Sequence, residues 1–301
     1  MNVASEQLAS PEVYKLVIEN LEDHAIFMMD PAGSIKTWNK GAELQLGYSE
    51  TEVLDKHFSL IFTGEDVRLG IPDGELRIAA KEGRCRDDRK HVRKDGVELW
   101  VNGVVTTIRS NAGELLGYSK VLNDISARVA AEDTIRHQAM HDTLTGLPNR
   151  KLMNDFLSGN LAVAEEQAHT FAILFIDMDG FKAINDTYGH EVGDILLETV
   201  GLRLATTVSR ADMVARFGGD EFIVIMNGAE QAQDLAEKIA LSLLPPVSVN
   251  GIDLQVTMSI GISIFPQDGA TAQSLIKAAD KALYRVKKQG GNGHSFYDQA
   301  A

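Results

Sequence analysis

Two apolar runs that flank a glycine pair and two acids constrain this chain more than any other stretch. Residues 213–215 and 223–226 are apolar, and between them stands Arg216-Phe217-Gly218-Gly219-Asp220-Glu221-Phe222. Such runs around a Gly pair predict a β-hairpin. Glycines at its tip allow the backbone to approach a phosphate, and adjacent carboxylates are ligands that Mg²⁺ accepts together with substrate phosphates. Taken alone, an acidic glycine-rich tip is more often a solvated turn, so both interpretations stay open.

A second stretch favours the metal-binding interpretation. Residues 171–176 form a continuous apolar run, typical of a buried strand, that ends in Asp177-Met178-Asp179. A carboxylate at the end of this strand can face a hairpin tip on a neighbouring strand. Asp177, Asp220 and Glu221 would then converge on a metal bound to a nucleoside triphosphate, the arrangement used for nucleotidyl transfer.

These residues resemble the GGDEF domain, the diguanylate cyclase family, which joins two GTP molecules into cyclic di-GMP. The resemblance runs from about residue 142 to residue 292, and several further stretches carry it: residues 142–150 (DTLTGLPNR), 177–186 (DMDGFKAIND), Gly189-His190, Gly193-Asp194 and residues 259–263 (SIGIS). It implies an α+β domain with a palm-like, ferredoxin-related sheet whose active edge lies at the hairpin.

The resemblance also implies the roles of single residues. Asp177 and Glu221 are expected to bind the metal with Met178 beside them, and Asp220 is a further ligand or the base for the attacking 3′-hydroxyl. The expected cofactor is Mg²⁺, with Mn²⁺ as the alternative. Further substrate contacts are expected from Gly180, Phe181, Lys182, Gly218, Gly219 and Lys287.

Recognition of guanine is assigned by the resemblance to Asn185 and Asp194. A carboxylate accepts hydrogen bonds from the ring N1–H and the exocyclic amine, a pattern that adenine does not offer. GTP is therefore the expected substrate. On sequence alone, Asp194 can equally be the N-cap of a helix that begins at Ile195.

The chain departs from the family pattern in two places. Family members under product inhibition carry Arg-x-x-Asp before the signature; here Asp212 is present, but Ser209 stands at the Arg position. Arg210 is one residue out of place, a turn of about 100° on a helix, so weak or absent feedback inhibition is expected. Gly291 replaces the Arg usual before Asn292, which bears on nucleotide affinity.

The first part of the chain, residues 11–127, is predicted to be a mixed α/β domain. Five strands at residues 25–30, 34–38, 91–93, 97–108 and 115–122 are expected to form an antiparallel sheet, with short helices at 39–47, 49–56 and 75–82. This order resembles a PAS sensory domain, on the stretches WNKGA (38–42), Gly47-Tyr48, RKDG (93–96) and DISAR (124–128). The resemblance implies a sensory or dimerisation role and names no ligand.

No chromophore is expected in this domain. His57 and His91 are the imidazoles in the pocket region, and a polar or surface role is favoured over haem ligation for each. Cys85 lies outside the flavin-adduct pattern. Phe27, Trp38, Phe58, Phe62 and Trp100 can line a small-molecule site, although such aromatics are more often ordinary core.

Residues 124–140 are predicted to form a connecting helix, because they are rich in alanine and free of Gly and Pro. Ile125, Val129, Glu132, Ile135 and Ala139 recur at spacings near three and four, which indicates either a solvated helix or a short dimer seam. The seam is favoured, because the expected chemistry needs two active sites face to face. The expected domains are residues 11–127, a connector at 128–141, and residues 142–298.

The composition limits the partners. The 301 residues carry a formal net charge of −14, which argues against a nucleic-acid or anionic-membrane surface. One cysteine excludes an intrachain disulfide. No apolar run has membrane-spanning length, and residues 1–12 lack a basic stretch followed by an apolar one. A soluble cytoplasmic protein without membrane insertion is expected.

The sequence thus predicts a dimeric diguanylate cyclase under the control of a PAS domain. The alternative is a catalytically silent module that binds GTP or a partner. A third possibility, a cyclase that forms cyclic AMP, would need a site that accepts adenine where Asn185 and Asp194 stand.

Overall fold

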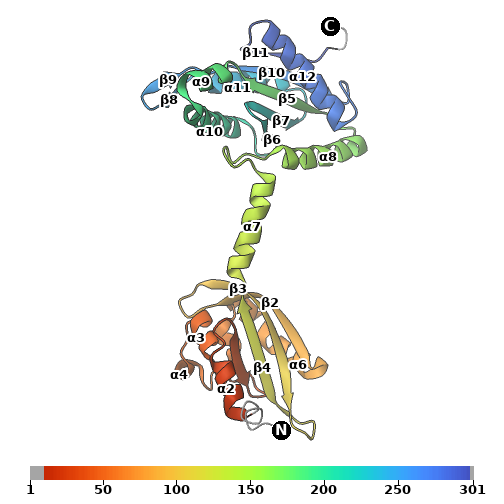
Figure 1. Cartoon of the computed structure of the whole chain (residues 1–301). Helices are drawn as coiled ribbons and strands as arrows, with labels where there is room; N and C mark the ends of the chain where they lie inside the picture. The colour runs from red at the N-terminus through yellow and green to blue at the C-terminus, as the bar shows by residue number, and fades with distance from the viewer. Residues whose placement is uncertain (1–9, 299–301) are drawn as a thin grey trace, which may run out of the picture. The chain divides into compact units, whose positions relative to one another are not determined.

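The fold is that of a computed structural model, which describes residues 10–298 apart from the side chain of Glu165 (Figure 1). Residues 1–9, on which the expectation about the start of the chain partly rests, lie outside the described residues. The chain divides into two compact units between Asp133 and Thr134, within helix α7 (Ser126–Met140). Among the described residues, no helix is both long and apolar enough to cross a membrane.

The first unit is a four-stranded antiparallel sheet in the order β1-β4-β3-β2. Its strands are β1 (Ala25–Met29), β2 (Arg84–Val92), β3 (Glu98–Arg109) and β4 (Leu115–Asp124). Its helices are α2 (Pro11–Glu19), α3 (Lys40–Leu46), α4 (Glu50–Val53), η1 (Phe58–Ile61), α5 (Gly64–Arg68) and α6 (Ile71–Glu82).

The predicted fifth strand, residues 34–38, is reduced to an isolated antiparallel bridge between Ile35 and Met29. Asp30 N–H donates to the Ser34 carbonyl at 2.9 Å and Lys36 N–H to the Met28 carbonyl at 2.8 Å, so the segment lies beside β1 as expected. It does not continue as a strand, because the main chain of Ile35 bonds to Asp55 and Lys56 on its other side, at 2.9 Å in each case. Strand β1 pairs with β4 over its whole length, with Ala25 opposite Leu122. Strand β2 begins at Arg84 rather than at residue 91. The sequence does not indicate the earlier start, because most side chains of this strand are charged and only every fourth one is fully buried.

The core of the first unit is aromatic, as expected for Phe27, Trp38, Phe58 and Phe62, which are all buried. One expectation about this core is wrong: Trp100 is 41% exposed and does not line the interior. Of the two roles expected for His91, the structure has the polar one, since this side chain is fully buried and hydrogen-bonded to Asp87.

The second unit contains a five-stranded mixed sheet in the order β11-β10-β5-β7-β6. Its strands are β5 (Phe171–Met178), β6 (Met213–Gly218), β7 (Glu221–Asn227), β10 (Met258–Phe265) and β11 (Gly293–Phe296), and a separate ribbon joins β8 (Val247–Val249) to β9 (Ile252–Leu254). The helices are α8 (Arg150–Gln167), α9 (Phe181–Tyr188), α10 (His190–Thr207), α11 (Ala232–Ser242) and α12 (Ala272–Lys288).

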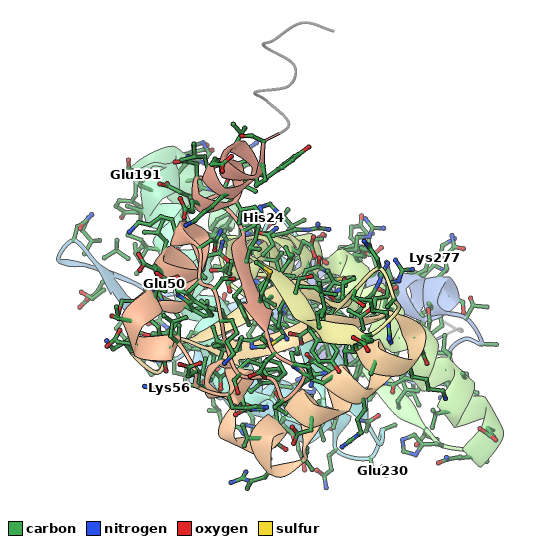
Figure 2. All side chains as sticks on the ribbon, turned by 90° about the horizontal axis from the view of Figure 1, so that it is seen from below. His24, Glu50, Lys56, Glu191, Glu230 and Lys277 are labelled. Atoms are coloured by element: carbon green, nitrogen blue, oxygen red, sulfur yellow. The ribbon has the colours of Figure 1, made fainter. Side chains whose placement is uncertain are left out.

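Helices cover both faces of this sheet. Side chains alternate along a strand, so β5 sends Ile176 and Met178 into a core shared with α10 and α11, and Phe175 into a second core shared with α8 and α12. By the same alternation Asp177 lies on the α8 and α12 face. Exposed charges such as Glu191, Glu230 and Lys277 lie at the periphery, as Figure 2 shows.

Candidate active site

The pairing of β5 with β7 brings two predicted site residues together. Asp177 on β5 lies directly opposite Glu221 on β7 in the antiparallel register. Directly opposed residues have Cβ atoms about 5 Å apart on the same face of a sheet. Asp177 is 6% exposed and Glu221 is half-buried, so two carboxylates share one poorly solvated place.

This crowding changes the proton affinity of both acids. Burial raises the pKa of Asp177, against the hydrogen bond from Lys287, and the negative charge of Asp220 raises it further. Burial raises the pKa of Glu221 as well, and the charges of Asp177 and Asp220 add to the effect. These three acids therefore act on one another electrostatically, and a cation placed between them would be strongly favoured.

Lys287 places a positive charge against Asp177. Its Nζ lies 2.6 Å from Asp177 Oδ2, and it projects from the last turn of α12. The sequence prediction made Lys287 a phosphate contact; in the structure this side chain neutralises an acid of the site.

The hairpin tip is held by its own backbone and by Arg216. Met178 N–H donates to the carbonyl of Asp220 at 3.3 Å, which ties the end of β5 to the tip. Arg216 donates from Nε and Nη2 to the carbonyl of Gly219 at 2.9 and 2.7 Å. Gly219 has a φ of +56°, a conformation that favours glycine. Gly218 and Gly219 are both exposed, so their amides are open to a ligand.

The next residues, Met178 and Asp179, have structural surroundings. The side chain of Met178 is buried in the α10 core, so only its main chain is available to a metal. Asp179 accepts hydrogen bonds from Thr257 Oγ1 at 2.8 Å, Ser259 Oγ at 2.6 Å and Asn292 N–H at 2.9 Å. Asp179 thus joins the end of β5 to β10 and to the turn before β11.

Gly291 lies against this Asp179 carboxylate. Its φ is +77°, and an added Cβ would come within 2.8 Å of Asp179 Oδ1. A side chain at this position would therefore meet both an unfavourable backbone conformation and the Asp179 carboxylate.

The two residues predicted to read guanine lie on neighbouring helices. Asn185 is on α9 and Asp194 on α10, and an added Cβ at Gly193 would meet Asn185 Oδ1 at 1.9 Å. Asn185 Oδ1 is buried without a hydrogen-bond partner in the described structure, a costly state that a ligand donor would relieve. Because α10 begins at His190, Asp194 lies in its second turn, and its alternative role as an N-cap is wrong.

The expected phosphate contacts surround the start of α9. Gly180 is the N-cap, with a φ of +72°, Phe181 packs partly against the core, and Lys182 is exposed on the first turn. A helix start of this kind presents free N–H groups to an anion.

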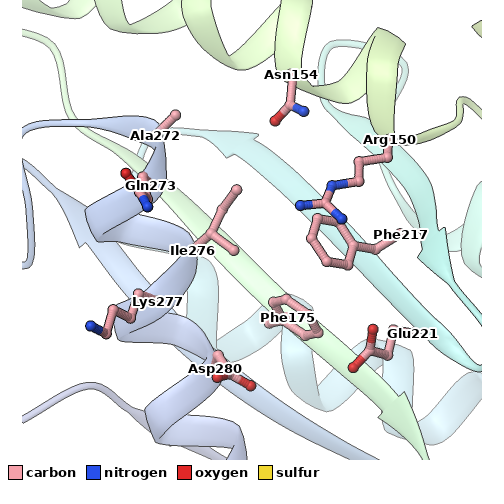
Figure 3. Close-up of a pocket in the computed structure, with 10 residues that line it drawn as sticks. All are labelled: Arg150, Asn154, Phe175, Phe217, Glu221, Ala272, Gln273, Ile276, Lys277 and Asp280. Atoms are coloured by element: carbon pink, nitrogen blue, oxygen red, sulfur yellow. The ribbon is translucent and has the colours of Figure 1, made fainter.

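A pocket of about 610 Å³ opens beside Glu221, between α8 and α12 (Figure 3). Phe175 and Phe217 form its floor, with ring centroids 5.2 Å apart. The Arg150 guanidinium stacks over the Phe217 ring at 4.3 Å. The pocket gives a substrate access to Glu221 from the α8 and α12 side.

The donor set fits a hard divalent cation in its chemistry: two opposed carboxylates, a third carboxylate at the hairpin tip and the main chain of residue 178. In the described structure, however, no three acidic, His or Cys side chains are already gathered into a metal-binding group. Lys287 occupies Asp177 instead, so this side chain has to turn away when a cation binds there.

The predicted inhibitory site is also partly occupied. Asp212 Oδ1 accepts the N–H of Asn227 at 2.8 Å, and Ser209 and Arg210 follow the end of α10 rather than standing on it. Asp212 is therefore engaged in holding the end of β7.

The comparisons with known proteins agree with this architecture. Residues 139–293 match the family model "Diguanylate cyclase, GGDEF domain", and residues 23–127 match the PAS domain model. The chain belongs to the GGDEF-domain family, and its first unit carries a PAS domain.

Two relatives come from Pseudomonas aeruginosa. The bifunctional diguanylate cyclase/cyclic di-GMP phosphodiesterase MucR is 42% identical over 164 residues, which is 54% of this chain and 24% of MucR. The diguanylate cyclase TpbB is 36% identical over 227 residues, 73% of this chain and 50% of TpbB. This chain thus spans half or less of the length of these relatives.

A solved structure gives the same fold for the second unit. The crystal structure of the GGDEF domain of TpbB has a TM-score of 0.50 and 35% identity, and the match covers 51% of this chain and 98% of that domain.

Sequence reasoning did not single out Asp142, Asp179 and Arg216 as structural residues of the site. Asp142 and Asp179 lie within the motifs that carried the resemblance, but a motif gives no indication of which acids bind ligand and which hold the backbone. Arg216 directly precedes the predicted tip, and its position was the available signal.

Proposed function

We propose that the chain is a diguanylate cyclase, which condenses two GTP molecules into cyclic di-GMP and two pyrophosphates. The observation that carries the proposal is the juxtaposition of Asp177 and Glu221 across β5 and β7, beside the Gly218-Gly219-Asp220 tip. In this proposal residues 11–127 are the sensory domain, 128–141 the connector and 142–298 the catalytic domain. Since GTP is a cytoplasmic nucleotide, the catalytic domain would work in the cytoplasm.

Each site residue has a defined part in the proposed reaction. Asn185 and Asp194 hold guanine, and the N–H groups around Gly180 and Phe181, with Lys182, hold the triphosphate. Lys287 turns from Asp177 to a phosphate oxygen, which leaves the Asp177 carboxylate free. Asp220 accepts the proton of the 3′-hydroxyl of the second GTP or binds metal, and positioning of the two nucleotides supplies most of the acceleration.

Asp177, Glu221, Asp220 and the main chain of Met178 would hold Mg²⁺, with Mn²⁺ as the alternative. When bound, the ion neutralises the charge that develops on the phosphate oxygens. The raised pKa values of Asp177 and Glu221 support this assignment, because such acids gain most from a nearby cation.

Two copies of the chain are required, because each catalytic domain would hold one GTP. Helix α7 supports a dimer seam: none of its side chains is buried, and Ile135 is among its exposed apolar residues. Feedback inhibition by cyclic di-GMP is expected to be weak or absent, given Ser209 and the engaged Asp212.

The test is incubation of the purified chain with Mg²⁺ and GTP, followed by separation of the products. Cyclic di-GMP is expected, and Asp220→Ala and Asp177→Asn should each lower its formation by about a thousandfold or more. Asp186→Asn, an exposed acid on the same helix as Asn185, is the matched control and should keep the rate. Unchanged GTP would contradict the proposal.

The alternative function is a silent module that binds GTP or a partner. The Lys287–Asp177 ion pair favours it, because an acid paired at 2.6 Å is not free to bind metal. The variant Lys287→Met separates the cyclase from the silent module. A cyclase should lose affinity for the triphosphate of GTP in this variant. A silent module should bind GTP and form no product, whether Lys or Met stands at position 287. Product from ATP alone would indicate a cyclase that forms cyclic AMP.

A further inference from the structure

The interior of the PAS domain contains a cluster of ionisable side chains in a place where an organic ligand would be expected. Asp87, His91 and Lys120 are fully buried, and Glu75 is 3% exposed. They come from three elements: Glu75 from α6, Asp87 and His91 from β2, and Lys120 from β4. Buried ionisable groups are rare unless they are paired, so this cluster needs a physical account.

Lys120 is the centre of the cluster. Its Nζ forms an ion pair with Asp87 and donates to Glu75 Oε2 at 2.8 Å. It also lies over the rings of Phe58 and Phe62, at 5.2 and 4.7 Å from their centroids. These side chains fill the space between the sheet and the helices with the protein's own groups.

The hydrogen bonds of His91 demand an additional proton. Its Nδ1 lies 2.9 Å from the carbonyl oxygen of Ile61, and its Nε2 lies 2.6 Å from Asp87 Oδ2. A carbonyl oxygen only accepts, so Nδ1 carries a proton. The contact of Nε2 with a carboxylate oxygen then needs a second proton, on the imidazole or on Asp87. The pair therefore holds one proton more than a neutral imidazole beside an ionised carboxylate.

Glu75 gives independent evidence that the cluster holds an additional proton. Its Oε1 is buried without a hydrogen-bond partner in the described structure, and Arg89 Nε is 3.5 Å away. An ionised carboxylate with one unsatisfied buried oxygen is costly. A proton on the cluster reduces that cost.

The charges that face the cluster support the count. They are Asp66 on α5, Glu75 on α6, Asp87 and Arg89 on β2 and Lys120 on β4, with the thiol of Cys85 nearby. With every acid ionised and His91 neutral, three negative charges oppose two positive ones. One bound proton makes this interior neutral.

We infer that the signal read by this PAS domain is a proton, bound in its core between Glu75, Asp87 and His91. The inference deepens the proposed function, because it names the regulation of the cyclase and rests on that function only for the final step. Burial raises the pKa of Glu75 to about 7, against the nearby charge of Lys120 and with help from Asp87. Burial lowers the pKa of His91, and the pKa of Asp87 is lowered, against its burial, by the hydrogen bond with His91 and the charge of Lys120. Glu75 is therefore the member of the group through which the proton is expected to be lost near neutral pH.

The cluster is connected to the helix that leaves the domain. Lys120 lies on β4, which ends at Asp124, and α7 begins at Ser126. Ile125 N–H donates to the carbonyl of Trp100, and Trp100 N–H donates to Ser126 Oγ, both at 2.8 Å. Loss of the proton leaves an unbalanced charge under β4. We expect the hydrogen bonds that join Trp100 to Ile125 and Ser126 to open more often as a result.

The first test is infrared difference spectroscopy of the full chain between pH 6 and pH 8, without nucleotide. A protonated buried carboxyl, or an imidazolium seen by ¹⁵N NMR of labelled histidine at His91, is expected at pH 6 and lost by pH 8. Because this measurement uses the unaltered protein, it does not depend on the folding of a variant. An unchanged protonation state from pH 5.5 to pH 8.5 would overturn the inference.

The second test compares Glu75→Gln with Glu98→Gln, an exposed acid of the same domain that pairs with Lys90. Gln is a neutral isostere of protonated Glu, so Glu75→Gln should fold and release about one proton fewer than the unaltered chain between pH 6 and pH 8. Hydrogen exchange at Trp100 and Ile125 should rise with pH in the unaltered chain and in Glu98→Gln beyond the intrinsic change, but not in Glu75→Gln.

Three outcomes overturn the inference: superimposable titrations of Glu75→Gln and the unaltered chain, exchange that ignores the substitution, or a stoichiometric organic molecule released on denaturation. None of these readouts needs GTP turnover. A chain that binds the proton but makes no cyclic di-GMP would therefore refute the proposed function and leave the proton site standing.

Discussion

Arg216 donates two hydrogen bonds from Nη1 to the carboxylate of Asp142, at 2.9 Å to Oδ1 and 3.1 Å to Oδ2. Asp142 stands two residues after the end of α7, and the same guanidinium holds the carbonyl of Gly219 in the signature hairpin. One side chain therefore ties the entry of the catalytic domain to the tip that carries Asp220.

Replacement of this guanidinium should cost both stability and rate. Arg216→Ala leaves the half-buried Asp142 without its charged partner, and a loss of about 2 kcal/mol in the free energy of unfolding is expected. The tip loses its anchor, so cyclic di-GMP formation should fall by about tenfold or more. Urea unfolding and product analysis measure the two effects. Arg210→Ala, at an exposed arginine, is the control, and equal behaviour of the two variants would refute the link.

Acid should remove the contribution of Asp142. Burial opposes ionisation of this acid, but the hydrogen bonds from Thr145 and the Arg216 guanidinium together lower its pKa below 3.8. The folded state then holds fewer protons than the unfolded state, so this stability is present above pH 3.8 and lost as pH falls through the folded value. The stability difference between the unaltered chain and Asp142→Asn should narrow from pH 5 to pH 3. A stability difference that stays constant from pH 5 to pH 3 would contradict this account. The control Asp155→Asn, at an exposed acid, should show no stability difference from the unaltered chain that changes with pH.

Position 291 should reject a side chain. Gly291→Ala combines a positive φ with a contact of 2.8 Å to Asp179 Oδ1, whereas Gly290→Ala has a φ of +108° and meets nothing within 4 Å. Gly290→Ala should cost about 1 kcal/mol in the free energy of unfolding for its backbone alone. Gly291→Ala should cost about 1 kcal/mol more than that. Thermal unfolding measures both, and equal losses would show that the Asp179 contact is unimportant.

The guanine site should close when Gly193 gains a methyl group. Gly193→Ala would press against Asn185 Oδ1 at 1.9 Å, so the KM for GTP should rise about tenfold or more while stability changes little. Gly159→Ala, on α8 with nothing within 4 Å of its added Cβ, should keep the KM. An unchanged KM in Gly193→Ala would remove Asn185 from the recognition of GTP.

Product inhibition should appear when the missing arginine is supplied. Ser209→Arg is expected to lower the cyclic di-GMP concentration for half-inhibition by about tenfold, because a guanidinium forms paired hydrogen bonds with phosphate. Ser209→Lys provides the charge without that geometry and should have a smaller effect. Tight binding of cyclic di-GMP by the unaltered chain, with Asp212 as a contact, would contradict the prediction of weak inhibition.

The strongly patterned elements of the catalytic domain could be read from the sequence. The run at residues 171–176, the hairpin and the last helix have apolar periods that leave little choice, and the structure has β5, β6 with β7, and α12 at these places. The strand β11 was missed, because Gly293-His294-Ser295-Phe296 carries no apolar pattern and is held by parallel pairing with β10.

The errors in the PAS domain have a common cause. Periodicity reports how a side chain is solvated and not how far a pairing extends, so the sequence predicts a full strand at residues 34–38 where the structure has a single bridge to β1. The sequence does not indicate that Asp87 and His91 lie in the core, because charge in a sequence indicates solvent unless its counter-charges are known. Lys120 and Glu75, distant in sequence, supply them only after folding.

Helix α7 has no buried side chain, while each unit around it has its own core. A helix that packs on neither core can change its length without exposing either one, so insertion of one heptad, which keeps the proposed seam in register, should leave both domains intact. The catalytic half should accordingly accept a foreign sensor at this helix, and a new input could be grafted onto the same output without redesign of either core.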